Sequence, residues 1–187
     1  MVPRLGDGGR LAGMLTEAQL RAALSELAER LRARGATGRI YIVGGAAMAL
    51  AYDSDKLTRD IDAAIIEGHG SVIEAVRDIA RARGWPSTWL KEQATPYLPT
   101  APDRHSNVVF DHPALKVMAA SPEHLLAMKV RAARSSDVTD VRQLLSRTGL
   151  SDAGQVEALV ESVFPEERLG ERQRRWLEDL LAGCEQG

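Results

Sequence analysis

The sequence predicts an α/β fold of the α+β type, in which a small mixed sheet flanked by helices precedes an all-helical C-terminal part. A short apolar strand at 39–43 passes through a glycine pair into an alanine-rich helix, and a second apolar strand follows at 58–66. Near residue 121 this mixed pattern gives way to helical periodicity alone. We therefore expect three regions: a flexible leader at 1–14, an α/β core at 15–120 and a helical region at 121–187.

The composition favours a cytoplasmic protein that binds no membrane. The 187 residues include 24 Lys and Arg against 26 Asp and Glu, so the net charge of -2 excludes the strongly basic balance of an obligate nucleic-acid binder. A local basic face is still compatible with this balance. The single cysteine, Cys184, forms no internal disulfide, and no apolar run is typical of a signal peptide or a membrane span.

Local signals define the first elements of the expected core. Thr16 and Gln19 have the form of a capping box, which opens an amphipathic helix that ends at Gly35. The segment 39–43 is a short buried strand. The glycine turn after it leads into a helix at 46–52.

The rest of the expected core is a strand, a helix, a loop and a hairpin. The strand at 58–66 is followed by an amphipathic helix at 71–83. Prolines interrupt the segment 85–105, so we expect it to be a loop over the site without regular structure. Two short strands at 106–110 and 114–118 then form a hairpin.

Beyond residue 120 the sequence predicts helices only. Ser121 is a favourable N-cap residue, and Pro122 suits the first position of a helix. The expected helices span 122–134, 137–147, 152–163 and 171–182.

The feature most informative about function is the alternating carboxylate pair Asp60 and Asp62. Side chains on a strand alternate between its faces, so both carboxylates project to one side while Ile61 points into the core. Two neighbouring carboxylates repel each other unless a cation lies between them, and Mg2+ takes oxygen ligands while leaving room for nucleotide phosphates. The pair predicts a metal site, with an exposed polar strand face as the alternative.

The pair Gly44 and Gly45 lies between a strand and a helix. This position brings backbone N–H groups and a helix N-terminus together, which suits the binding of a phosphate. The alternative is a tight turn that needs positive φ.

Lys129 lies on the apolar side of its helix, because its neighbours three and four positions away are leucines and alanines. A lysine directed inward needs an anion, and we expect a substrate triphosphate or the Asp60 and Asp62 pair to supply it. A lysine that extends past the edge of the core is the alternative. Asp140 lies beside the apolar stripe of the next helix, with helix capping or pairing with a nearby arginine as its alternative role.

Several arginines fall close to Lys129 in the sequence. They predict a basic face for a nucleic-acid acceptor, or a solvated surface paired with neighbouring acids. The histidines show no metal-ligand spacing, and no Ser, His and acid arrangement is recognisable, so zinc and hydrolase sites have no support. The arginines proposed for RNA contact are Arg131, Arg134 and Arg142, with Arg172, Arg174 and Arg175 as further candidates.

Four segments together resemble the AbiEii-like nucleotidyltransferases of the DNA polymerase β-like superfamily, which include the MenT-type toxins. The resemblance implies a polymerase β-like core, a nucleoside triphosphate substrate and Mg2+ or Mn2+ as the cofactor. The segments are Val43–Ala47, Thr58–Asp62, Leu125–Lys129 and Asp137–Val141.

The resemblance also implies a role for each matching residue. Gly44, Gly45, Asp60 and Asp62 hold nucleotide and metal, and Lys129 contacts the nucleotide phosphates. Asp140 completes the catalytic set, and we expect it to orient Lys129 or to assist the acceptor. We add Lys56 and Thr58 to the nucleotide-binding residues. This chain departs from the pattern at Gly45, where many members have serine, and in a slightly long spacing to Asp60.

Family members of this kind are commonly toxins that add nucleotides to the 3′ end of tRNA. The resemblance implies that activity here, with a cognate antitoxin as partner. Two alternatives are a small-molecule acceptor, as in aminoglycoside nucleotidyltransferases, and a non-catalytic binding or antitoxin module of the same fold. Thr58 lies two positions before Asp60, so a phosphate on it would block an incoming triphosphate, and we add Thr58 phosphorylation as a regulatory hypothesis.

Overall fold

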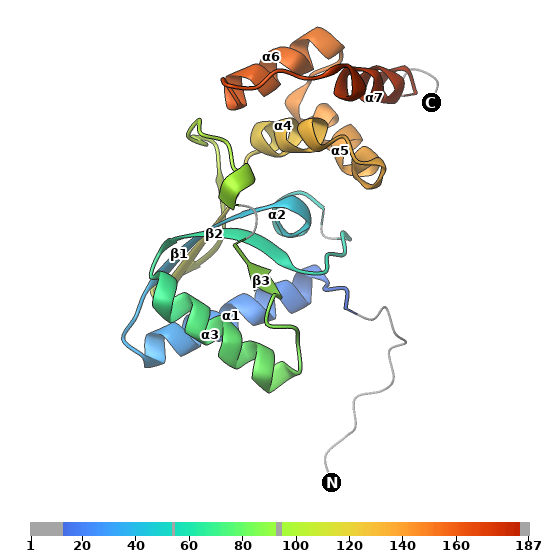
Figure 1. The fold of residues 1–187 in the computed structure, drawn as a ribbon. Helices are drawn as coiled ribbons and strands as arrows, with labels where there is room; N and C mark the ends of the chain where they lie inside the picture. The colour runs from blue at the N-terminus through green and yellow to red at the C-terminus, as the bar shows by residue number, and fades with distance from the viewer. Residues whose placement is uncertain (1–12, 54, 93–94, 184–187) are drawn as a thin grey trace.

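A computed structural model describes residues 13–53, 55–92 and 95–183. Figure 1 shows α1 (Glu17–Ala33) and α3 (His69–Arg83) side by side against the sheet, and a group of C-terminal helices beyond α2 (Gly44–Ala51). The expected α/β fold with a small mixed sheet and C-terminal helices is confirmed. The proposed leader at 1–14 lies almost entirely outside the described residues.

Within the described part of the chain the sheet has five strands in the order β3-β2-β1-β5-β4, with β1 at its centre. β1 runs antiparallel to β2 and parallel to β5, while β4 pairs antiparallel with β5 and β3 pairs parallel with β2. The predicted hairpin is therefore present as β4 and β5. The strands span Gly38–Val43 (β1), Ile61–Glu67 (β2), Leu90–Lys91 (β3), Asn107–His112 (β4) and Leu115–Ala119 (β5).

Two expectations about the core are corrected. β2 begins at Ile61, so Asp60 lies immediately before the strand and not within it, and Thr58 pairs instead with Leu15 in an isolated bridge. The segment expected to be a loop contains β3 and a 3-10 helix at Thr95–Tyr97 (η1). β3 forms because its backbone pairs with β2, a long-range contact that gives no periodic signal in the sequence.

The C-terminal helices follow the predicted pattern closely. Thr16 and Gln19 make both bonds of the expected capping box at the start of α1, and Ser121 caps the start of α4. Within the described residues no helix combines the length and the apolar stretch needed to cross a bilayer. The helical elements after β5 are α4 (Pro122–Ala132), the 3-10 helix η2 (Ser135–Asp137), α5 (Val138–Thr148), α6 (Ala153–Val163) and α7 (Glu171–Ala182).

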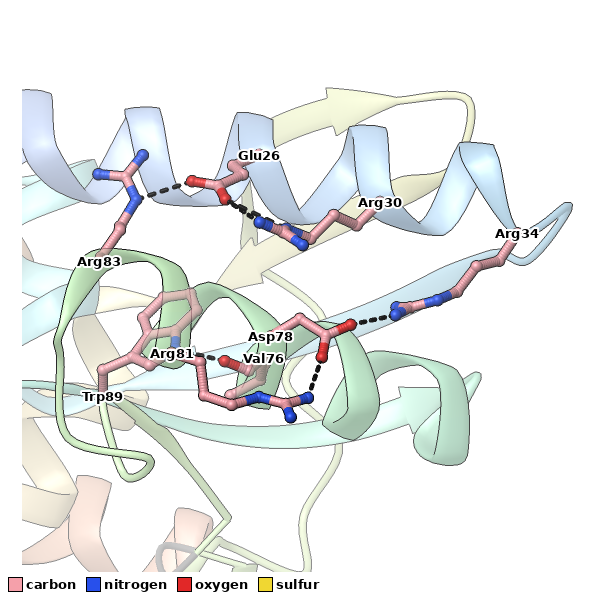
Figure 2. Close-up of polar contacts among 8 residues, drawn as sticks. All are labelled: Glu26, Arg30, Arg34, Val76, Asp78, Arg81, Arg83 and Trp89. Carbon is pink, nitrogen blue, oxygen red and sulfur yellow. Dashed lines mark hydrogen bonds and ion pairs between the residues drawn. The ribbon is translucent and has the colours of Figure 1, made fainter.

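Ion pairs and one hydrogen bond connect α1, α3 and the segment before β3 (Figure 2). Glu26 of α1 accepts hydrogen bonds from Arg30 at 2.6 Å and from Arg83 of α3 at 2.7 Å. The Trp89 indole Nε1 donates to the Val76 carbonyl at 3.0 Å. Trp89 is fully buried, and its own carbonyl accepts from the Ile61 N–H at 2.7 Å, so this residue fixes the start of β3 beside the start of β2.

Candidate functional site

A cavity of about 730 Å³ lies between one end of the sheet and the C-terminal helices. Its sheet side is formed where β1 ends and where β2 and β3 lie in register, and its other side is formed by α4, α6, α7 and their connections. The residues of this cavity that carry the argument below are Gly44, Gly45, Asp62, Lys91, Tyr97, Lys129, Arg131, Arg134 and Arg168.

The glycine turn lies directly on the cavity wall. Gly44 has φ +65, a left-handed conformation that favours glycine, and a Cβ on it would lie 3.3 Å from Asp62 Oδ2. The preceding Val43 provides no side-chain cap for α2. The tight-turn interpretation is therefore confirmed. The N–H groups in the first turn of α2 have no side-chain cap, and phosphate binding by them stays a prediction.

Gly45 faces Thr58 at close range. A Cβ on Gly45 would lie 2.7 Å from Thr58 Oγ1, which is closer than Cβ contacts occur in proteins. The Thr58 hydroxyl itself donates to the Asp60 carbonyl at 3.1 Å. A serine at position 45 would therefore displace Thr58, and this contact explains the departure from the pattern seen in the sequence.

Asp60 and Asp62 converge on the ammonium group of Lys91. Lys91 Nζ lies 2.8 Å from Asp60 Oδ2 and 3.5 Å from Asp62 Oδ1. Burial raises the pKa of Asp62 above its usual value, and nearby Asp60 adds to the rise while Lys91 and Arg134 oppose it. We call these three residues, Asp60, Asp62 and Lys91, the carboxylate cluster.

The donor set of the carboxylate cluster fits a hard divalent cation. Its two carboxylates already point at one cation, the Lys91 ammonium, so their oxygen atoms converge as metal ligands do. Across the described ranges no three His, Cys, Asp or Glu side chains form a metal-binding group. A cation bound here would therefore have two protein carboxylates and would depend on water or substrate oxygens for its other ligands.

Lys129 is buried in α4, as its apolar neighbours predicted, but the protein anions that it contacts are not the Asp60 and Asp62 pair. Its Nζ lies 2.6 Å from Asp137 Oδ1 and 2.8 Å from Asp140 Oδ2. The Asp60 and Asp62 pair is occupied by Lys91 instead, so the expectation that this pair serves Lys129 is corrected. Asp137 begins α5 without capping it through its side chain, because the carboxylate is engaged by Lys129.

Asp140 also forms an ion pair with Lys56, whose Nζ lies 2.6 Å from Asp140 Oδ1. Burial alone would raise the pKa of Asp140, but hydrogen bonds and charges from Lys129 and Lys56 hold it below its usual value. Asp140 is buried and does not line the cavity, so it reaches a substrate only through the lysines that it orients. We call Lys56, Lys129, Asp137 and Asp140 the ion-pair cluster.

The proposed RNA-contacting arginines differ in where they lie. Arg131 and Arg134 line the cavity, and Arg131 also pairs with Glu167 and stacks on Phe164 at 4.6 Å. Arg142 is exposed on α5 and does not line the cavity. The α7 arginines Arg172, Arg174 and Arg175 are also exposed and lie outside it.

Sequence reasoning missed several residues that line the cavity. Lys91 lies in the segment expected to be a loop, where only its position after the buried pair Trp89 and Leu90 indicates a strand. Tyr97 lies at the cavity with 64% of its surface exposed, and Arg168 adds a further cation. The cavity therefore contains more positive charge than the predicted residues supply.

One comparison with known proteins identifies a family. A family model for a nucleotidyltransferase of unknown function (DUF6036) matches residues 18–176. The match includes every residue that lines the cavity and all members of both clusters. No curated protein matches the chain.

Proposed function

The chain belongs to a family of nucleotidyltransferases of unknown function, and we propose that it transfers a nucleoside monophosphate from a nucleoside triphosphate to an acceptor hydroxyl in this cavity. The observation that carries the proposal is the convergence of a glycine turn, the Asp62 carboxylate and several cations on one cavity, with Asp60 connected to that cavity through its contact with Lys91. A triphosphate is polyanionic, so a site of this kind combines backbone donors, cations and metal-binding carboxylates.

Each part of the site has a proposed task. Asp60 and Asp62 would hold Mg2+ or Mn2+, which when bound neutralises phosphate charge and lowers the pKa of the acceptor hydroxyl. The N–H groups after Gly44 would bind phosphate oxygens, and Lys129 would bind the departing phosphates. The acceptor oxygen forms a bond to the α-phosphorus as the bond to the bridging oxygen breaks, pyrophosphate leaves, and the hydroxyl proton passes to water.

Asp140 is best described as a positioning residue in this scheme. Its carboxylate contacts Lys129 and Lys56 at 2.8 and 2.6 Å and is shielded from the cavity. It holds two flexible lysine side chains in place before substrate arrives, which reduces the entropy lost on binding. Lys56 does not line the cavity, so it would act on the nucleotide only through Asp140 and Lys129.

We propose the 3′ end of tRNA as the acceptor, and a toxin role controlled by a cognate antitoxin in the cytoplasm. The support from the molecule is an excess of cations at the cavity, although the whole chain carries a net charge of -2. The cations that line it are Lys91, Lys129, Arg131, Arg134 and Arg168, against the acids Asp62, Asp137 and Glu167. Such an excess of positive charge attracts a phosphate backbone. The acceptor identity otherwise rests on the resemblance to the AbiEii-like enzymes.

A small-molecule acceptor is the second candidate, because a cavity of about 730 Å³ suits a ligand of that size. This candidate predicts that pyrophosphate is released when an aminoglycoside is present and RNA is absent. A non-catalytic module predicts no release with any acceptor and no stabilisation by nucleotide and metal together.

Regulation through Thr58 is a further part of the proposal. The Thr58 side chain lies between Gly45 and Asp60, so a phosphate there would carry negative charge into the nucleotide site. Thr58 is buried and its backbone pairs with Leu15, so modification would require this pairing to open. Antitoxin shut-off that is unchanged in Thr58→Ala would contradict the hypothesis.

Incubation with total RNA and each α-labelled nucleoside triphosphate in turn tests the proposal. We expect Mg2+-dependent label on RNA of tRNA size, seen on a denaturing gel. Removal of the tRNA 3′ hydroxyl by periodate oxidation is the matched control and should prevent labelling. Label on no RNA, with pyrophosphate released only when an aminoglycoside is added, would favour the second candidate.

A further inference from the structure

Lys91 lies where a cation bound by Asp60 and Asp62 would lie. Its ammonium is 2.8 Å from one carboxylate and 3.5 Å from the other, and Lys91 also lines the cavity. The position is built into the sheet, because Lys91 is in register with Asp62 on the neighbouring strand. Trp89 directly precedes β3, and the hydrogen bond from its indole to the Val76 carbonyl of α3 holds the start of this strand in place (Figure 2).

The charges of the carboxylate cluster do not balance. Two carboxylates and one ammonium leave one net negative charge, so the cluster still attracts a divalent cation. That cation would use the same carboxylate oxygens, and a positive group cannot stay within 3.5 Å of both once the cation binds. The ammonium must then find another anion.

The cavity offers Lys91 such an anion when nucleotide binds. Lys91 has a flexible stem of four methylene groups and three N–H donors, so its ammonium can turn without moving the backbone of β3. Gly44 and Gly45 form the adjacent cavity wall, where a phosphate would lie.

We propose that Lys91 is an exchangeable counter-ion, which neutralises Asp60 and Asp62 before nucleotide binds and turns to the triphosphate when the cation takes the carboxylates. The proposal rests on the metal and nucleotide assignments of the proposed function. Its consequence is a coupling between the two ligands, because each one removes the obstacle to the other. Linkage makes this coupling reciprocal: nucleotide strengthens metal binding by the factor by which metal strengthens nucleotide binding.

The test measures Mn2+ affinity by calorimetry or electron paramagnetic resonance, without nucleotide and with α,β-methylene analogues of the four nucleoside triphosphates. In Lys91→Gln we expect Mn2+ alone to bind about tenfold tighter than in the wild type, because a competing cation is gone. The coupling factor should fall about tenfold as well. Lys91→Arg keeps the charge and should retain most of the wild-type coupling.

Two controls separate this result from a loss of folding. Lys116→Gln removes a lysine from β5 that does not line the cavity, and it should leave both affinities unchanged. Lys91→Met tests the same loss of charge with a stem of similar length. A coupling factor compares each variant with itself, so a smaller folded fraction changes the stoichiometry and not the factor.

The outcomes distinguish this inference from the proposed function. Mn2+ binding that is equal or weaker in Lys91→Gln and Lys91→Met, with coupling unchanged, would overturn the counter-ion role and leave the metal site intact. Absence of Mn2+ binding to any variant, even with every analogue, would overturn the metal assignment and the counter-ion role together. Tighter binding of Mn2+ alone with reduced coupling supports the proposal.

Discussion

The carboxylate cluster and the ion-pair cluster contain the same chemical groups in different environments. Side chains of Asp60 and Asp62 are 29% and 33% exposed, whereas those of Lys129 and Asp140 are 9% and 3% exposed. The carboxylate cluster has two acids for one lysine, and the ion-pair cluster has two acids for two lysines. The carboxylate cluster therefore has accessible acids and is short of positive charge. The ion-pair cluster has a buried centre at Lys129 and Asp140, a partly exposed Lys56 and balanced charge.

This difference teaches which cluster can bind a metal ion and which mainly holds Lys129 in place at the cavity wall. Asp60 and Asp62 are accessible and share one ammonium group, so they can exchange Lys91 for a metal ion at little cost in free energy. A buried, balanced network cannot, because removal of one member leaves an unpaired charge away from water. We therefore expect substitutions in the carboxylate cluster to affect activity, and substitutions in the ion-pair cluster to affect stability first.

The largest expected effect comes from Asp60→Asn. It removes a proposed metal ligand, so transfer of labelled nucleotide should fall on the order of a thousandfold or more. The melting temperature without ligands should change little, since Asp60 is half-buried and belongs to the accessible cluster. Single-turnover assays and thermal melts on one preparation measure both quantities. A large loss of stability with intact transfer would contradict the expectation that the carboxylate cluster acts in catalysis and not in folding.

Asp140→Asn should show the opposite result, with a large loss of stability as its first effect. It leaves Lys129 and Lys56 without their shared carboxylate, and a broken buried ion pair costs about 3 kcal/mol in the free energy of unfolding. Urea melts measure this cost, with the exposed Asp179→Asn on α7 as the control, for which we expect less than about 0.5 kcal/mol. Equal costs for the two substitutions would show that the ion-pair cluster is not a structural network.

A smaller effect is expected at the glycine turn. Gly45→Ser places a side chain against Thr58, so we expect a loss of about 1–2 kcal/mol in the free energy of unfolding, together with weaker nucleotide binding. Thr58→Ala removes the hydroxyl that lies 2.7 Å from the new Cβ and should restore part of the loss in the double variant. A double-mutant cycle measures this coupling, and strictly additive losses would contradict the contact.

The smallest expected effects are opposite pH dependences of stability. Asp140 has a lowered pKa in the folded state, so its contribution is present above the unfolded value near 3.8 and is lost as the pH falls below it. Asp62 has a raised pKa, so its charged form reduces stability as the pH rises through the folded value. Denaturant melts between about pH 3 and pH 7 should therefore show a reduced acid dependence in Asp140→Asn and a small gain near neutral pH in Asp62→Asn.

The sequence predicted those features that depend on local signals. The capping box at Thr16 and the N-cap at Ser121 define the ends of two helices through contacts three residues apart. The inward direction of Lys129 followed from its neighbours on one helix. Features set by pairing across the chain were not predictable in this way, because no local pattern encodes them.

Lys91 is the clearest example of such a feature. A strand of two residues in a proline-rich segment has no periodicity, and its pairing with Asp62 spans the whole of α3. Asp140 was predicted to orient Lys129 and does contact it, but Asp137 as the second partner of Lys129 was missed for a related reason. Asp137 lies at the end of η2, directly before α5, and its carboxylate contacts Lys129 on α4. Because these contacts depend on how the chain folds back, the sequence does not indicate that Lys91, and not Lys129, contacts the Asp60 and Asp62 pair.

The most direct test of the account is Mg2+-dependent pyrophosphate release, measured with each nucleoside triphosphate and total RNA. We predict release by the wild type with Mg2+, no release when the metal is chelated, and no release by Asp60→Asn although that variant remains folded. Release by folded Asp60→Asn at the wild-type rate, or release by the wild type without any divalent cation, would contradict the assignment of the carboxylate cluster as the catalytic metal site.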